Sequence, residues 1–417
     1  MANAEDEARP SGPSPRPRSE PGTLLPTVKA AGAEPRCCGG PPPRDQLPEP
    51  PRASWIDGAV KTVVGDVPRV RTALSRRDRL GAVRARWGVG RMRYRVRPGL
   101  YAVGAPRADS PVLVSANYKL SFDHLRRALG GRDAWILVLD TRGINVWCAA
   151  GKGTFGTDEI VRRVQGASLG NVVSHRTLIV PQLGAPGVSA HEVRRRCGFR
   201  VVYGPVRAAD LPAFLDDGLK ASPQMRRVRF DLRDRVILVP VEVVTGGKFA
   251  LLVAAGFLLL GGLGPHGYSL GAVRLVGLSA AALALGAFLG GAILGPTLLP
   301  WLPGRALSLK GAVLGLILAA AVAAIGWLGP GLGLGLGLGP EPGPGPAGSW
   351  LHLAAWGLMI PAVTSFVVMN FTGATTYTSL SGVLREMRIA VPAQIVVGAL
   401  GLALWVTGLF LNKGGAA

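Results

Sequence analysis

The chain has 417 residues, is 48% hydrophobic and carries a formal net charge of +22. Its mean hydropathy of +0.31 excludes a purely soluble protein, so a membrane part is expected. The positive charge comes mostly from arginines scattered over the first part of the chain, with no DNA- or RNA-binding motif around them, which argues against nucleic acid and favours an anionic membrane surface and an acidic redox partner.

The N-terminal segment, residues 1–53, is rich in Pro, Arg, Gly and Glu and has almost no aromatic or β-branched residues. Such a segment cannot bury enough apolar surface to order itself, so it is predicted to be a disordered extension. It lacks the basic-then-apolar pattern of a signal peptide. The domain that follows is therefore expected to remain in the cytoplasm.

Residues 54–222 alternate between strand and helix patterns. The alternation of strands and helices favours a largely parallel sheet covered by helices, which predicts an α/β, Rossmann-like domain. The last predicted helix begins with a predicted capping box, formed by Ser189 and Glu192. The predicted strands are 111–116, 134–140, 177–181 and 200–203, and the predicted helices are 122–129, 157–164 and 189–197.

A segment of small residues follows the strand predicted at 134–140, at the point where α/β sheets usually bind a ligand. Asn145 is a good helix N-cap and places Cys148 in the first turn, where backbone N–H groups and the helix dipole favour a thiolate. A flat ligand would fit against the small residues, with the cysteine sulfur at its centre, whereas a core helix would carry Leu or Ile there. These residues are Ala149, Ala150, Gly151 and Gly153.

The chain has four cysteines and no Cys-x-x-Cys pair. The usual spacing for a structural zinc site or a self-contained iron–sulfur cluster is therefore missing, and any electrons that the protein needs come from another chain. The fragment Gly151-Lys152-Gly153-Thr154 lacks the spacing of a P-loop, which argues against nucleotide hydrolysis.

The run Asn145-Val146-Trp147-Cys148-Ala149-Ala150-Gly151-Lys152-Gly153-Thr154-Phe155 resembles the cap-helix motif of the corrinoid protein of microbial mercury methylation. That family is related to the corrinoid iron–sulfur proteins of the acetyl-CoA pathway. The resemblance extends from about residue 55 to the C-terminus and includes 115–120, with Ser115 where the family usually has Thr, and 370–380. It implies that residues 145–154 bind cobalamin and that Cys148 is the lower axial ligand of the cobalt.

Several residues keep two interpretations beside this resemblance. Ser115 either hydrogen-bonds the corrin edge or orients the thiolate, or it is a plain strand-end hydroxyl. Lys152 either reaches the amide or phosphate periphery of the cofactor or is simply exposed to solvent. Cys37 and Cys38 are either incidental thiols or a capture site for a soft metal. The two glycines of the motif are better explained by close approach of the corrin than by turn chemistry alone.

The resemblance implies a corrinoid-dependent methyltransferase. A methyltetrahydrofolate-linked donor would methylate the cobalt, methylcobalamin ligated by Cys148 would pass the methyl group to inorganic Hg(II) to give methylmercury, and a ferredoxin-like iron–sulfur partner would return the cobalt to its reduced state. One alternative is a membrane-bound corrinoid methyl carrier of one-carbon metabolism with a different acceptor. Another is a transporter with a soluble regulatory domain, which the scarcity of ionisable residues in the apolar segments disfavours.

A basic linker, residues 223–248, precedes the predicted transmembrane domain, residues 249–417. Connections that contain Arg or Lys alternate with connections that contain neither, which predicts a multi-pass protein of the inner membrane with the corrinoid domain in the cytoplasm. The Thr-rich loop 370–381 either docks that domain or a partner, or only caps helices. The five apolar segments run at about 249–263, 275–294, 311–328, 351–369 and 391–411.

Overall fold

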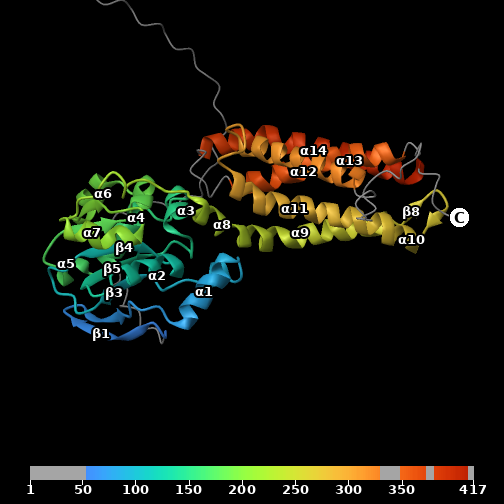
Figure 1. Cartoon of the computed structure of the whole chain (residues 1–417). Helices are drawn as coiled ribbons and strands as arrows, with labels where there is room; N and C mark the ends of the chain where they lie inside the picture. The colour runs from blue at the N-terminus through green and yellow to red at the C-terminus, as the bar shows by residue number, and fades with distance from the viewer. Residues whose placement is uncertain (1–52, 329–347, 372–379, 412–417) are drawn as a thin grey trace, which may run out of the picture. The chain divides into compact units, whose positions relative to one another are not determined.

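The computed structural model describes residues 53–328, 348–371 and 380–411. The predicted N-terminal extension with Cys37 and Cys38 lies outside these residues. So do residues 329–347, between two of the predicted apolar segments, and most of the Thr-rich loop 370–381. Along the described chain an α/β domain comes first and a helical region follows it (Figure 1).

The α/β domain contains seven strands, and helices lie in most of the connections between them (Figure 1). In chain order its elements are β1 (Ile56–Thr62), β2 (Gly65–Val70), α1 (Arg76–Arg86), η1 (Arg91–Arg93), β3 (Gly99–Val103), β4 (Val112–Ala116), α2 (Lys119–Ala128), β5 (Ala134–Leu139), α3 (Val146–Gly151), α4 (Thr157–Gly166), α5 (Leu169–Val172), β6 (Thr177–Val180), η2 (Gln182–Gly187), α6 (Ala190–Cys197), β7 (Arg200–Tyr203), η3 (Ala208–Asp210) and α7 (Leu211–Asp216).

The strands form one mixed sheet in the order β1-β2-β3-β5-β4-β6-β7. The pairs β2–β3, β5–β4, β4–β6 and β6–β7 are parallel, which confirms the predicted largely parallel sheet. The other side is different, because β3 runs antiparallel to β5 and β1–β2 is an antiparallel pair. This side comes from residues before 111, where the sequence patterns predict no individual strand.

Helices cover both faces of the sheet. Side chains of β4 and β5 alternate between two apolar layers, one with α4, α5 and α6 and the other with α2 and α7. Thus Val114 packs in the first layer, and Leu113 packs with Phe122 and Phe214 in the second. The chain leaves β4 for β5 on one side and later returns to β6 on the other, so the strand order reverses at β4. Ligands of α/β sheets bind at the carboxyl ends of the strands beside such a point.

Two local predictions are wrong in detail. The helix predicted to begin at residue 122 begins at Lys119, whose side chain is 8% exposed and pairs with two aspartates. The predicted capping box at Ser189 does not form. The Ser189 hydroxyl bonds the His191 ring at 3.1 Å, and Glu192 pairs with Arg195 at 2.7 Å.

The helical region contains five helices long and apolar enough to cross a membrane among the residues that the structure describes. This confirms the number predicted, although the first apolar helix begins well before residue 249, inside the segment assigned to the basic linker. The principal helices are α8 (Leu232–Val236), α9 (Val239–Leu260), α11 (Leu278–Leu298), α12 (Leu307–Leu328), α13 (Gly348–Met369) and α14 (Leu380–Leu411).

Aromatic rings and glycines hold these helices together. Phe257 of α9 lies 5.3 Å from Trp356 of α13 and 5.0 Å from Trp405 of α14, measured between ring centroids. A Cβ atom added at Gly291 of α11 would lie only 3.1 Å from Val367 of α13, so the missing side chain allows a close approach. The helices therefore pack side by side as a bundle (Figure 1).

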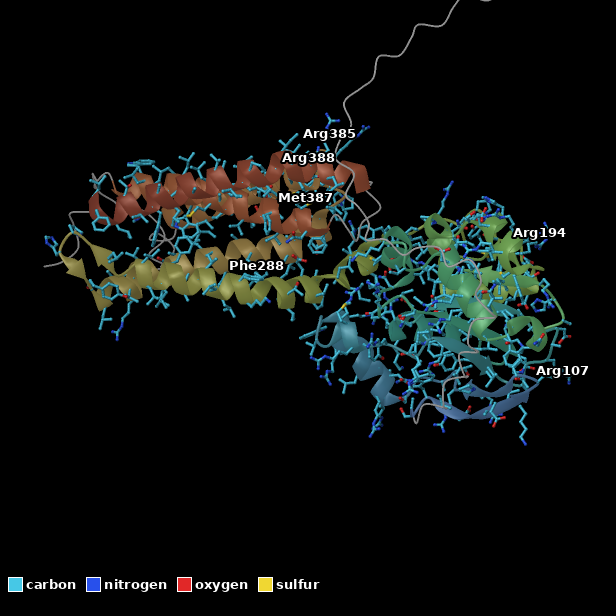
Figure 2. All side chains as sticks on the ribbon, turned by 180° about the vertical axis from the view of Figure 1, so that it is seen from behind. Arg107, Arg194, Phe288, Arg385, Met387 and Arg388 are labelled. Atoms are coloured by element: carbon cyan, nitrogen blue, oxygen red, sulfur yellow. The ribbon has the colours of Figure 1, made fainter. Side chains whose placement is uncertain are left out.

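Arginines gather at one end of this bundle. Figure 2 shows Arg385 and Arg388 there on α14. The start of α12 lies at the same end, because the Ser308 amide donates a 2.6 Å hydrogen bond to Glu386. Arg305, which directly precedes α12, therefore belongs to the same basic end.

Candidate functional site

The predicted N-cap is confirmed at the start of α3. Asn145 has an extended backbone (φ −65°, ψ 161°), and its side-chain oxygen accepts a 2.9 Å hydrogen bond from the Cys148 amide. Cys148 is therefore the third residue of α3, on the segment that follows the carboxyl end of β5. The cap fixes the backbone that carries the thiol.

The short helix α3 has one buried and one open face. Val146, Ala149 and Ala150 are buried, at a spacing of three and four residues. The same spacing places Cys148, Gly151 and Lys152 together on the opposite face. Cys148 is partly exposed, and Gly151 and Lys152 are exposed. The structure thus brings the cysteine to the surface beside a residue without a side chain.

The buried face of α3 is held by the turn that follows β6. A Cβ atom at Gly187 of η2 would collide with the Phe155 carbonyl oxygen and lie 3.1 Å from the Ala150 Cα atom. A Cβ atom at Gly184 would collide with the Phe155 ring, which is fully buried. Glycine is needed at both places because backbone and ring occupy the space, and the result is a rigid support behind the helix.

Among residues 53–328, 348–371 and 380–411, none packs against the open face of α3 where its two glycines lie. A Cβ atom at Gly151 or Gly153 would meet no atom within 4 Å. Gly153 has a φ of +77°, so the turn alone requires glycine there, contrary to the expectation that ligand contact explains both glycines. Gly151 is helical, where glycine is less favourable than alanine, and no described residue lies close enough to explain the absence of a side chain.

The remaining predicted residues lie around this face. Trp147 is partly exposed, and Thr154 is partly buried with its hydroxyl 3.4 Å from the Ala149 carbonyl oxygen. Ser115 is 3% exposed and bonds the Ala116 carbonyl at 3.3 Å. It shares a strand face with Leu113, in the layer opposite to that of α3, so the structure favours the strand-end interpretation of its hydroxyl.

Asn117, to which the sequence interpretation gave no role, connects two strand ends below α3. It is 2% exposed and follows β4. Its side-chain oxygen accepts from the Thr141 amide at 3.1 Å, the Thr141 hydroxyl at 2.8 Å and the Gly143 amide at 2.9 Å. Its side-chain nitrogen donates to Asp140 at 3.1 Å. Asn117 therefore fixes the loop between β5 and α3, and its place directly after a strand was the available signal.

A buried ion network lies next to Asn117 and joins α1 to α2. Lys119 is 2.7 Å from Asp78 and 2.8 Å from Asp123, and Arg126 is 2.9 Å from Asp78. Burial alone raises the pKa of Asp78, but hydrogen bonds from Lys119 and Ser75 outweigh it and hold that pKa far below its ordinary value. Two carboxylates face two cations, so the formal charges of the network balance.

The usual ligand sets of metal sites in proteins combine several His, Cys, Asp or Glu side chains. Among the described residues there is no group of three or more His, Cys, Asp or Glu that would hold a metal ion.

The α/β domain that contains α3 resembles known proteins. Residues 90–215 match the family of the CO dehydrogenase/acetyl-CoA synthase delta subunit. The match begins just before η1 and ends within α7, so it includes β4, β5 and α3. The helical region lies outside it.

Relatives are archaeal subunits of one complex. The acetyl-CoA decarbonylase/synthase complex subunit gamma of Methanopyrus kandleri is 32% identical over 123 residues, which are 29% of this chain and 26% of that protein. The same subunit of Archaeoglobus fulgidus is 29% identical over 123 residues, 29% of this chain and 26% of the relative. That of Methanosarcina acetivorans is 31% identical over 122 residues, 28% and 26% of the two chains. The chain spans about a quarter of the length of these relatives.

Proposed function

We propose that the α/β domain binds a corrinoid cofactor and that Cys148 is the lower axial ligand of its cobalt. The observation that supports this most is the open face of α3. There the partly exposed Cys148 thiol lies beside Gly151, and no described residue packs closely enough to require glycine at that position. The match of residues 90–215 and the resemblance of residues 145–155 to a corrinoid cap motif support the same cofactor.

The residues present suit such a cofactor. A corrin is wide and flat, and the open face around Gly151 offers no obstructing side chain. A corrinoid would bring its own nitrogen ligands, so the Cys148 thiolate would be the one ligand that the protein needs to supply. Residues 145–154 would form the contact surface, with Lys152 at its edge. A bound corrinoid supplies a cobalt centre that accepts a methyl group and passes it on.

The protein side chains would set the position and the electron donation of the lower ligand. Asn145 accepts a hydrogen bond from the Cys148 amide, and Asn117 accepts one from the Gly143 amide in the loop before α3. Both bonds fix the backbone from which the Cys148 side chain extends. A Cys148 thiolate is a stronger electron donor than an imidazole. In a bound corrinoid, such a donor from Cys148 would suit methyl transfer to a soft electrophile.

We further propose methyl transfer as the activity and inorganic Hg(II) as the acceptor, on the strength of the cap-motif resemblance and the thiolate ligand. The methyl donor would be linked to methyltetrahydrofolate, and a ferredoxin-like iron–sulfur protein would supply electrons. The names of the relatives support a second candidate, a methyl carrier of one-carbon metabolism that serves another acceptor.

The same proposal places the chain in the inner membrane. Five helices are long and apolar enough to span it, and Arg305, Arg385 and Arg388 gather at one end of the bundle. By the positive-inside rule this end faces the cytoplasm, which also puts the α/β domain there.

The visible absorption spectrum of the full-length protein reconstituted with cobalamin tests the cofactor and its ligand. Wild type is expected to show a base-off, thiolate-ligated cobalt spectrum that Cys148→Ala loses. Cys197→Ala is the matched control, since Cys197 is another partly buried cysteine, bonded to the Val193 carbonyl at 3.1 Å. Equal spectra from wild type and Cys148→Ala would refute the ligand assignment, and no cobalamin binding by either would refute the cofactor.

Methylmercury production separates the two acceptors. Cells that express the wild-type chain together with an iron–sulfur donor are expected to methylate Hg(II), and cells with Cys148→Ala are not. Cobalamin binding without methylmercury would refute the mercury acceptor and leave the methyl carrier.

A further inference from the structure

The helix α1 has its polar side turned toward the protein and an apolar side turned outward. Asp78 and Ala85 are its buried residues, at 5% and 1% exposure. Asp78 is held by Lys119 at 2.7 Å and by Arg126 at 2.9 Å. Most helices on a protein surface bury an apolar stripe instead. Here the ion network attaches the helix, and the apolar residues remain outside.

The outward side carries an apolar stripe. Leu80, Val83 and Trp87 are 61%, 46% and 51% exposed. Their spacing of three and four residues places them on one line along the helix, opposite Asp78 and Ala85. Large apolar side chains at this spacing, with a tryptophan at the helix end, are typical of helices that lie in the interface of a lipid bilayer.

Arginines flank the stripe. At 100° per residue, Arg79 and Arg86 lie along one edge, and Arg77 and Arg84 lie along the other. Residues 76–93 contain seven arginines and one acidic residue, Asp78, whose charge is already paired inside the domain. The outer face of α1 therefore combines exposed apolar groups with positive charge that no acidic residue of this segment opposes.

We propose that α1 docks the α/β domain on the anionic surface of the membrane that the chain itself spans, with Leu80, Val83 and Trp87 at the headgroup boundary and the flanking arginines on lipid phosphates. The proposal rests on the membrane location proposed above. A lipid surface fits because arginine stems extend to phosphates while the stripe enters the apolar boundary, and because a domain tied to spanning helices is always close to a bilayer.

Docking has a consequence for the candidate site. The backbone of η1, which follows α1, approaches the loop before α3: a Cβ atom at Gly143 would lie 3.0 Å from the Met92 carbonyl oxygen. The basic segment and the cysteine-bearing helix therefore belong to the same edge of the sheet. A docked α1 would hold the open face of α3 close to the membrane surface.

Site-directed spin labelling of the full-length protein in lipid nanodiscs tests the docking. Val83→Cys reports on the stripe, and Val63→Cys, 80% exposed in the turn after β1, is the matched control. The signal of the labelled unsubstituted chain is subtracted to remove the native cysteines. In discs rich in phosphatidylglycerol, the label at 83 is expected to be more accessible to oxygen and less accessible to a water-soluble nickel complex than the label at 63.

Charge provides the second arm of the test. Arg79→Gln with Arg84→Gln is expected to lower the ratio of docked to undocked domain by about fivefold for each arginine, on the order of thirtyfold for both, and phosphatidylcholine discs should have a similar effect. Equal accessibility of the labels at 83 and 63 in both lipids would overturn the proposal. So would shielding of position 83 that needs an added acidic protein. A chain that does not elute with nanodiscs at all would instead refute the membrane location.

Discussion

Replacement of Asn117 by alanine is expected to loosen the segment that carries Cys148 without unfolding the sheet. Alanine removes the oxygen that accepts from the Thr141 and Gly143 amides, both in buried residues. The Thr141 hydroxyl keeps a partner, the Ile144 carbonyl at 2.7 Å, and Asp140 keeps the Arg142 amide at 3.0 Å. Two backbone donors are therefore left without an acceptor.

The magnitude follows from those two donors. A buried polar group that loses its partner costs about 1–3 kcal/mol. For two amides, one of which gains a partial bond to water, the free energy of local opening should therefore decrease by roughly 2–4 kcal/mol. One factor of ten in an equilibrium corresponds to about 1.4 kcal/mol. Exchange of the amide hydrogens in this loop and in α3 should then be about 30- to 1000-fold faster.

Hydrogen–deuterium exchange of the full-length protein, read by mass spectrometry over residues 140–155, measures this opening. Ser115→Ala is the matched control, since its hydroxyl is equally buried but makes only a 3.3 Å bond within β4. Peptides from β4 should be unchanged in both variants. Exchange in 140–155 that matches wild type in Asn117→Ala would refute the argument that this side chain fixes the loop.

Three further predictions concern packing, charge and the open face. Gly187→Ala should lower the free energy of unfolding by about 1–3 kcal/mol, because its Cβ would overlap the Phe155 carbonyl, and urea denaturation measures the loss. Gly151→Leu should leave that stability nearly unchanged, since it adds a side chain in open space, but should weaken cobalamin binding at least tenfold in a spectral titration; unchanged affinity would place the corrin elsewhere. Asp78→Asn should destabilise the domain by about 3–5 kcal/mol at pH 7, since it leaves Lys119 and Arg126 buried with one carboxylate. Folding lowers the pKa of Asp78, so the Asp78 carboxylate contributes fully to the free energy of unfolding above the ordinary aspartate pKa of about 3.9 and progressively less below it. The free energy of unfolding measured from pH 7 to pH 2 should therefore decrease less in the variant than in wild type.

The sequence by itself determined the parts of the protein that local pattern controls. The apolar runs at 134–140 and in the last part of the chain identify a buried strand and five apolar helices, because burial and length are properties of a single segment. The N-cap of α3 was equally local, since Asn145 and Cys148 are three residues apart. The small residues after it predict a surface for a flat ligand.

Only the tertiary structure decided how distant segments meet. The mixed pairing of β3 with β5, the η2 turn behind α3 and the link from Asn117 to the β5 loop join residues that are far apart in sequence, and no period or motif encodes such contacts. For the same reason, the sequence could not show that the apolar stripe of α1 faces outward. Its sequence shows arginines and apolar residues at helical spacing, but which side is buried depends on Lys119 and Arg126, which approach Asp78 from another helix.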